Sequence, residues 1–224
     1  MPMAGKGMLL TSMDIDASDE ADFNRWYDRE HLQERVAIEG FLEARRYIAH
    51  DASPKYLCLY STSTIEVLDS PAYKSRLANP TEWSKKTMAR FQNMVRAVAR
   101  ITISRGQGRG AALGIVRIRP IAGSEGKLRA SLQHALDPLD LDGVISMHLI
   151  ESDPALSGPT TEIASAASAG AGDWFVLIDA TDVHSAFAAT AARLGDDAPF
   201  RSAVISTGIY SLMWDLAGSD IGLF

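Results

Sequence analysis

The sequence has a single cysteine, Cys58, among its 224 residues. One thiol excludes an intramolecular disulfide and a zinc site made of cysteines. Cys58 lies in the stretch YLCLY, which is typical of a strand. We therefore expect it to be a small buried hydrophobic residue rather than a reactive thiol.

Long apolar runs are absent as well. No stretch approaches the roughly 18 residues that a membrane helix needs, and Asp14 and Asp16 come too early for a signal peptide. We expect a cytoplasmic protein without a membrane partner. The net charge is -6 and the basic residues are scattered, so we expect no nucleic-acid partner.

Motifs for metals and nucleotides are missing too. The five histidines form no HxH or HxxxH pair that would predict a metal site; they stand at positions 31, 50, 134, 148 and 184. Residues 106–114 are rich in glycine but precede a strand, so they do not match a dinucleotide-binding loop. We expect neither a metal nor a nucleotide cofactor.

The first half of the chain predicts the order strand, helix, strand, strand, helix, strand. Ser18 is the expected N-cap of the first helix, and the second helix is expected to break at Asn79-Pro80, with Asn79 capping its second piece. The expected strands are 8–15, 41–49, 56–62 and 98–104, and the expected helices are 18–37 and 70–97.

The second half repeats this order after a Gly/Arg linker at 105–111. Gly40 and Gly143 match at an offset of 103 residues, and so do His31 and His134, which predicts helices of equal length. An Ala/Ser/Gly-rich insertion at 155–172 is expected to be a mobile loop.

The βαββαβ order is that of the ferredoxin-like fold, in which helices cover one face of the sheet only. Two such halves can bury their bare sheet faces against each other. We therefore predict an α+β protein made of tandem duplicated ferredoxin-like domains that form a barrel within one chain. The predicted domains are 1–106 and 107–224.

The stretch FNRWYDREHLQERVAIEGFLEARRY, with ANPTEW further on, resembles the EthD-like branch of the dimeric α+β barrel superfamily. The matching residues include Phe23, Trp26, Tyr27, His31 and Gly40, and the resemblance covers residues 8–104. The second half shares only the topology. The resemblance implies a pocket between sheet and helices that takes a small, mostly apolar organic ligand, and it leaves the reaction open.

Phe23, Tyr27 and His31 follow one another at intervals of four residues and share one helix face. They can form a core stripe. Beside an apolar pocket, however, His31 could act as a general base near neutral pH. Both interpretations stay open, and Tyr27 and His31 are the predicted catalytic residues.

Arg46 takes the place of a core leucine if the strands of the two halves are aligned at the same offset, because Leu149 is its counterpart. A buried arginine needs an anionic partner. That partner could be a helix carboxylate such as Glu34, or an anionic group of a substrate. Arg45 and His148 fall on the opposite face, inside the barrel, where they could bond to each other.

The predicted substrate-binding residues are Arg46 and four aromatic residues, Phe23, Trp26, Tyr73 and Trp83. Trp83 also fits a core position. Glu30 is expected to be a solvated helix residue. His134 is either a relic of a second site or a coincidence, so we expect one working pocket, in the first half.

Three functions fit these observations. The first is an acid–base isomerase, cyclase or lyase without a cofactor, acting on a small aromatic or lactone-like substrate. His31 would move the proton, Tyr27 would donate to the oxyanion, and Arg46 would hold the anionic end.

The second is a cofactor-independent monooxygenase of phenols or quinones, with a heme variant in which a histidine binds iron. The third is a non-catalytic binding or assembly protein, in which His31 and Arg46 satisfy each other or nearby acids and no cavity remains. A homodimer is possible in each case.

Overall fold

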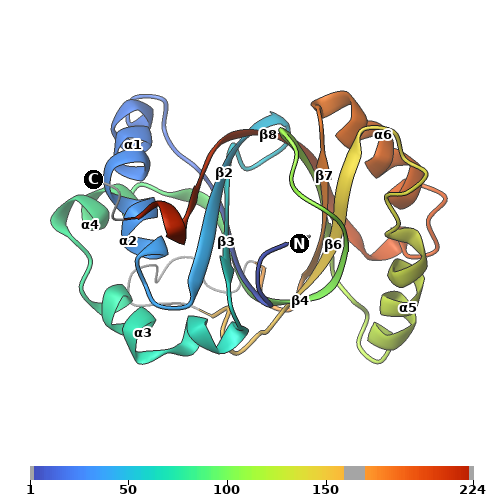
Figure 1. Ribbon diagram of the computed structural model, residues 1–224, viewed down its shortest axis with the longest axis horizontal. Coiled ribbons are helices and arrows are strands. Elements are labelled where there is room, and N and C mark those ends of the chain that lie inside the picture. The colour runs from blue at the N-terminus through green and yellow to red at the C-terminus, as the bar shows by residue number, and fades with distance from the viewer. Residues whose placement is uncertain (1–2, 159–169, 222–224) are drawn as a thin grey trace.

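The computed structural model describes residues 3–158 and 170–221, which form a closed antiparallel barrel of eight strands in the order β1-β3-β2-β8-β5-β7-β6-β4. Helices lie outside the barrel on two opposite sides (Figure 1). The strands are β1 (Gly7–Asp14), β2 (Phe41–Asp51), β3 (Tyr56–Thr62), β4 (Gln92–Gly106), β5 (Ala112–Ile118), β6 (Val144–Ser152), β7 (Trp174–Ala180) and β8 (Val204–Ala217).

Each half contributes four strands in the same relative order. The first half supplies β4-β1-β3-β2 and the second β8-β5-β7-β6, and the halves join at the β2–β8 and β4–β6 pairs. This arrangement confirms the predicted fold class, in which two ferredoxin-like halves close one barrel. The division into domains 1–106 and 107–224 stays a prediction.

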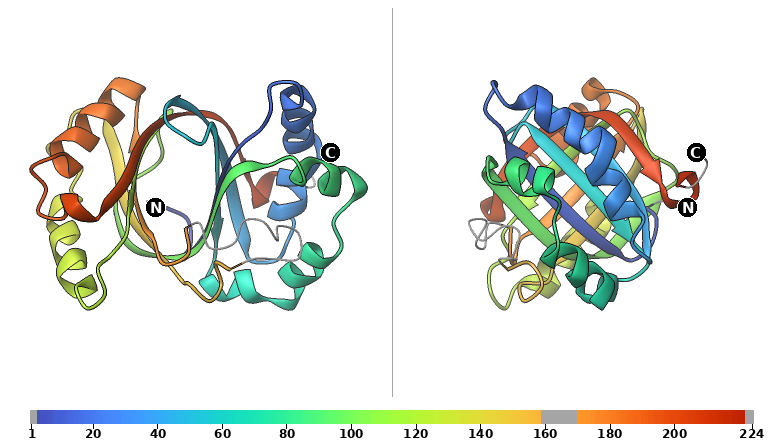
Figure 2. Two further views of the ribbon diagram at one scale, coloured as in Figure 1. Left: turned by 180° about the vertical axis from the view of Figure 1, so that it is seen from behind. Right: turned by 90° about the vertical axis from the view of Figure 1, so that its left-hand side faces the viewer.

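Helices cover the outer face of each half, and the right-hand view of Figure 2 shows those of the first half lying across its strands. None of the helices in the described part of the chain is long and apolar enough to cross a membrane. The helices are α1 (Glu20–Trp26), η1 (Tyr27–His31), α2 (Leu32–Val36), η2 (Ile65–Asp69), α3 (Pro71–Ala78), α4 (Glu82–Met88), α5 (Glu125–Ala135), α6 (Val183–Leu194), η3 (Arg201–Ala203) and η4 (Gly218–Asp220).

The caps of two first-half helices differ from the prediction. The N-cap of α1 is Asp19, while the Ser18 hydroxyl donates to Asp16 in the preceding turn. The N-cap of α4 is Thr81, whose side chain accepts from the Ser84 amide. Asn79 instead ends α3 and donates to the Ser75 carbonyl. Ser18 and Asn79 each form a hydrogen bond with a preceding residue, so neither side chain caps the helix that follows it.

Gly40 and Gly143 keep the equivalence that the offset predicts. Their φ angles are 90° and 73°, a left-handed conformation that favours glycine, and each precedes the second strand of its half. The helices that precede these two glycines are not equivalent in length. The first-half helical segment runs from residue 20 to 36 and α5 only from 125 to 135, so the predicted equal length is wrong.

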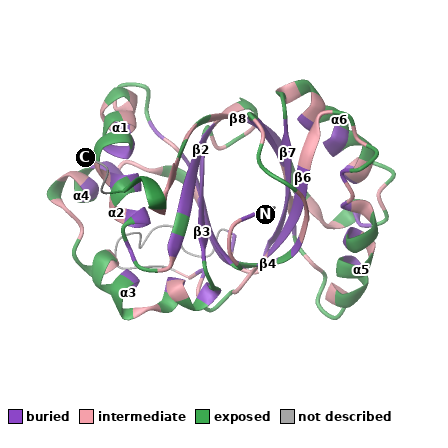
Figure 3. Cartoon of the chain, in the orientation of Figure 1, coloured by how far each residue is buried: buried purple, intermediate pink, exposed green. Residues whose placement is uncertain are grey.

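Three apolar layers hold the molecule together, and Figure 3 shows β3 and β7 buried between them. The barrel interior forms one layer, and the helix-covered face of each half forms another. Strands β1 and β3 are buried on both faces for this reason, which explains their almost continuous apolar sequence. Cys58 lies 1% exposed under the first-half helices, as expected.

Charged residues are buried inside the barrel where the two halves meet. The Arg45 Nη1 donates to Asp179 at 3.2 Å, and the His148 Nε2 lies 3.6 Å from the same carboxylate. The prediction that Arg45 and His148 lie on the barrel face is confirmed. They share Asp179 instead of bonding to each other, so one buried acid joins both halves.

The insertion of the second half reaches across to the first. Leu156 packs against the first-half core, and the Ser157 hydroxyl accepts from the Val98 amide on β4 at 2.9 Å. The mobile loop predicted at 155–172 lies largely outside the described residues, which omit 159–169.

Candidate functional site

The first helical segment contains a π-helical turn at Tyr27–His31, where a continuous α-helix was expected. The Leu32 amide donates to the Tyr27 carbonyl five residues back. Turns of this kind are rare, and they occur frequently at functional sites. The two predicted catalytic residues stand at the two ends of the turn, and both face the sheet.

A cavity of about 30 Å³ lies between the first-half sheet and its helices, with room for about one water molecule. Three predicted site residues line it: Tyr27, His31 and Tyr73. Strands β1, β3 and β4 supply the other wall. The described residues that line it are Leu9, Thr11, Met13, Tyr27, His31, Arg35, Tyr60, Tyr73, Leu77, Met88, Phe91, Met94 and Arg96.

His31 is 7% exposed, and its ring is stacked on Trp26 with the centroids 4.1 Å apart. Its Nδ1 atom has no hydrogen-bond partner among the described residues. Burial lowers the pKa of His31 well below its usual value, and the charges of Arg35 and Arg46 lower it further. At neutral pH this imidazole is uncharged, so one of its two ring nitrogens carries a lone pair.

Trp26 fixes the position of that ring. Its indole Nε1 donates to Glu30 at 3.2 Å and to the Ser84 hydroxyl at 3.1 Å. Glu30 also accepts from Thr81 at 2.6 Å, so it ties the first helical segment to α4. The expectation of a solvated Glu30 is wrong. Trp26 lies behind His31 rather than on the cavity wall.

Two tyrosines present hydroxyl groups near the cavity. Tyr27 is 2% exposed, and its ring meets His31 edge-on with centroids 5.2 Å apart. The Tyr60 hydroxyl on β3 has no hydrogen-bond partner among the residues described. Burial raises the pKa of both phenols, so both stay protonated and can donate. Burial also raises the pKa of the Cys58 thiol to about 12, which keeps it unreactive.

Arg46 is 1% exposed and lies on the helix-covered face, as the alignment of the two halves predicts. Its Nη1 donates to Asp28 at 3.1 Å and its Nη2 to Asn24, and the guanidinium lies 4.3 Å from the centre of the Tyr27 ring. The suggested partner Glu34 bonds to Arg76 instead, because it faces α3. Arg46 does not line the cavity.

The two remaining predicted residues pack in the core. Phe23 lies among aromatic rings, with centroids 5.0 Å from Tyr27 and 4.8 Å from Tyr56. Trp83 is half-buried and packs against the same core from α4. Neither side chain reaches the cavity.

Sequence reasoning missed Arg35, Tyr60 and Arg96, which all line the cavity. Arg35 carries a detectable signal, because it follows His31 by four residues on the same helical segment. Arg96 was hidden by the expected helix at 70–97, whereas β4 already begins at Gln92. A residue assigned to the wrong element cannot be placed on a sheet face.

His134 is exposed on α5, so it is not the structural counterpart of His31. The corresponding layer of the second half is apolar, with Leu128 and Leu132 facing the sheet. The match at an offset of 103 residues does not extend to the local structure, because α5 begins later and lacks the π-turn.

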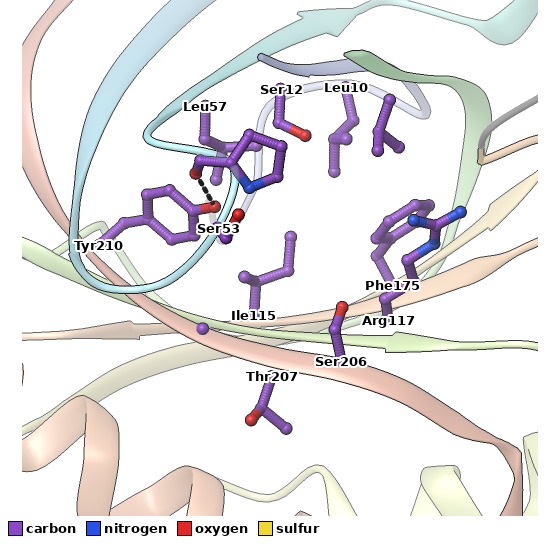
Figure 4. A pocket seen from close by; sticks show the side chains of 13 residues that line it. Leu10, Ser12, Ser53, Leu57, Ile115, Arg117, Phe175, Ser206, Thr207 and Tyr210 are labelled. Carbon is purple, nitrogen blue, oxygen red and sulfur yellow. Dashed lines mark hydrogen bonds between the residues drawn. The ribbon is translucent and has the colours of Figure 1, made fainter. Parts of the chain in front are cut away.

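A second cavity, of about 40 Å³, opens at one end of the barrel interior (Figure 4). The Tyr210 hydroxyl donates to the Pro54 carbonyl at 2.7 Å beside it. This cavity lies on the barrel side of the sheet, whereas His31 lies on the helix-covered side. None of the predicted site residues lines it.

No family model and no curated protein sequence matches the chain. Solved structures that are similar include an anthrone oxidase-like protein, with 10% identity, 100% of this chain and 99% of that chain covered, and a TM-score of 0.63. Candidate monooxygenases from Lactobacillus acidophilus (8% identity, 96% and 97% covered, TM-score 0.58) and Fusobacterium nucleatum (9% identity, 96% and 96% covered, TM-score 0.57) are similar too. These likenesses show the fold, which is that of the dimeric α+β barrel proteins.

Heme does not fit the residues present around His31. The adjoining cavity of about 30 Å³ would have to open much further for a porphyrin than for a single aromatic ring.

Proposed function

We propose that the protein is an enzyme that moves a proton on a small enolisable aromatic molecule, bound between the first-half sheet and its helices. The observation that carries this proposal is His31. It is a buried, uncharged imidazole with an unpaired Nδ1, held at the end of a π-turn and lining a cavity. Such a group can act as a general base.

The surrounding residues support this role. When a C–H bond next to a carbonyl loses its proton, negative charge develops on the oxygen. The protonated hydroxyls of Tyr27 and Tyr60 can donate to that oxygen, which lowers the barrier because they are fixed before the reaction. Trp26 keeps the imidazole in place, and Arg46 acts through the ring of Tyr27 rather than on the substrate.

The reaction class within this proposal is isomerisation, cyclisation or elimination, in which the proton returns to another atom or leaves with a leaving group. Membership of the EthD-like branch is part of the same proposal. It is supported by the aromatic pair and the histidine on the first helical segment, since Tyr27 and His31 both line the cavity.

A second candidate is the oxidation of the same carbanion by oxygen. It is supported by the similarity over nearly the full chain to an anthrone oxidase-like protein and to candidate monooxygenases. A methylene group and one O₂ would give a carbonyl group and one water. Oxygen consumption separates this reaction from isomerisation.

Substrate entry requires side chains to move, because ligand pockets usually measure about 300 Å³ or more. Three methionines line the present cavity: Met13, Met88 and Met94. Methionine is flexible and adapts to irregular shapes, which suits a pocket that opens around a planar ring. The non-catalytic alternative required a satisfied His31 and no cavity, and the unpaired Nδ1 argues against it.

The test uses anthrone and a panel of enolisable aromatic ketones and lactones. Loss of the acidic C–H signal in D₂O is followed by NMR, and oxygen uptake is followed with an electrode. His31→Gln should lower the enzyme-dependent rate by about 10² or more. His134→Gln, at an exposed site, should leave the rate unchanged. A folded His31→Gln protein with the full rate would show that the proposal is wrong.

A further inference from the structure

We propose that the molecule bound beside His31 carries a carboxylate group, and that Arg96 binds this carboxylate. The inference rests on the proposed function only in that it concerns the same pocket. It names the substrate class as aromatic or enolisable acids.

Arg96 lies on β4 opposite Thr11 of β1, on the helix-covered face of the sheet. The residue is 4% exposed and lines the cavity. Its Nη1 donates to two backbone carbonyls, those of Leu156 at 2.9 Å and Gly158 at 3.3 Å. These neutral acceptors hold the side chain in place but do not neutralise its charge.

Two other buried arginines of this chain have carboxylate partners. Arg45 lies 3.2 Å from Asp179, and Arg46 lies 3.1 Å from Asp28. In the part of the chain that the structure describes, no carboxylate oxygen lies within 4.0 Å of the Arg96 guanidinium. A guanidinium withdrawn from water without a counter-ion is costly, so the position favours an anion from outside the protein.

The free donors of Arg96 suit a carboxylate. With Nη1 occupied, Nε and Nη2 have no acceptor within hydrogen-bonding distance among the described residues. These two groups form one edge of the planar guanidinium, and such an edge binds the two oxygens of a carboxylate together. Among the described residues that line the cavity, two are arginines and one is a histidine, and none is Asp or Glu.

The placement is consistent with proton transfer at His31. Arg96 faces the cavity from the sheet, and His31 faces it from the helical segment. The aromatic side chains of Tyr27, Tyr60 and Phe91 also line the cavity, where they can cover a planar ring. A ring with a carboxylate would be oriented by Arg96 while another of its atoms meets His31.

The experiment measures binding of two matched pairs of probes, benzoate with benzamide and 2-naphthoate with 2-naphthamide, by ligand-observed NMR titration. Within each pair the size is nearly equal and only the charge differs. The wild-type protein should bind at least one acid about tenfold or more tightly than its amide, since hydrogen bonds to an ionised acceptor are the stronger ones. Equal binding of acid and amide in both pairs, or binding of none, overturns the inference.

Variants then locate the preference. Arg96→Gln should abolish it, and Arg96→Lys, which keeps the charge, should retain part of it. The matched control is Arg100→Gln on the same strand, where Arg100 is exposed and bonds to Glu66 at 3.3 Å; it should keep the full preference. A preference that survives in Arg96→Gln overturns the inference, and the wild-type comparison decides the matter if that variant does not fold.

His31→Gln separates this inference from the proposed function. It should still prefer acids to amides, because the carboxylate is bound by Arg96. If His31→Gln kept the full catalytic rate while the Arg96 variants lost the preference, the proton-transfer proposal would fail and the binding inference would stand.

Discussion

Replacing His31 should remove a specific pH dependence from the stability of the protein. The folded state holds His31 as an uncharged ring, because burial and two nearby arginines lower its pKa well below 6.5. The unfolded chain exposes the same ring to water, where its pKa is ordinary. Protonation therefore favours the unfolded state, and stability is lost as the pH falls below about 6.5.

The size of the effect follows from linkage. Below the unfolded-state pKa, one extra proton on the unfolded chain lowers the free energy of unfolding by up to about 1.4 kcal/mol per pH unit. Between pH 7.5 and 5.5 the contribution of His31 amounts to about 1.4 kcal/mol in total. The loss ends where the pH reaches the pKa of the folded state.

The assay is urea unfolding, followed by tryptophan fluorescence, of the wild type and His31→Gln at both pH values. The other four histidines are common to both proteins, so the difference between the two pH dependences belongs to His31. The wild type should lose about 1.4 kcal/mol more than the variant. An equal loss in the two proteins would show that His31 is charged or solvated when folded, which would also remove the free base from the proposed site.

Two further changes test contacts that hold the site and the barrel. Asp179→Asn should lower the free energy of unfolding by about 3–5 kcal/mol in urea, because it leaves Arg45 without its main counter-ion inside the barrel; a loss below about 1 kcal/mol would contradict this reading. Glu30→Ala should cost about 1–3 kcal/mol, since it removes the acceptor shared by Trp26 and Thr81. The exposed Glu66→Ala should change stability by no more than about 0.5 kcal/mol, and an equal effect of both variants would refute the role of Glu30.

Much of the fold could be predicted because local signals and the repeat agree. The strand of YLCLYST was expected at 56–62 and is β3 at those residues. Gly40 and Gly143 mark equivalent turns in both halves, and the element order fixes the barrel. The helix predicted at 70–97 is present as α3 and α4 up to Met88, and only its last part is wrong. Trp83, Thr87 and Met94 follow a helical period, although Met94 lies in β4.

The site could be predicted in part. Tyr27, His31 and Tyr73 line one cavity, since they belong to elements that were assigned correctly. The π-turn leaves no clear mark in composition, and the contacts of Trp26 and Glu30 with α4 join residues more than 50 positions apart in the sequence. The partner of Arg46 was missed as well. A strand alignment tells which face a side chain takes, but not which of several helix carboxylates it meets.

The Asp179 carboxylate inside the barrel is shared by two different residues, which one continuous chain allows and two identical subunits do not. Arg45 and His148 occupy corresponding positions, 103 residues apart, and both meet Asp179. In a dimer of identical subunits, a change at this position would be made twice. Two arginines would then face each other near the symmetry axis, and their like charges would repel. Within one chain the two positions carry different side chains, so a guanidinium and an imidazole can share one carboxylate.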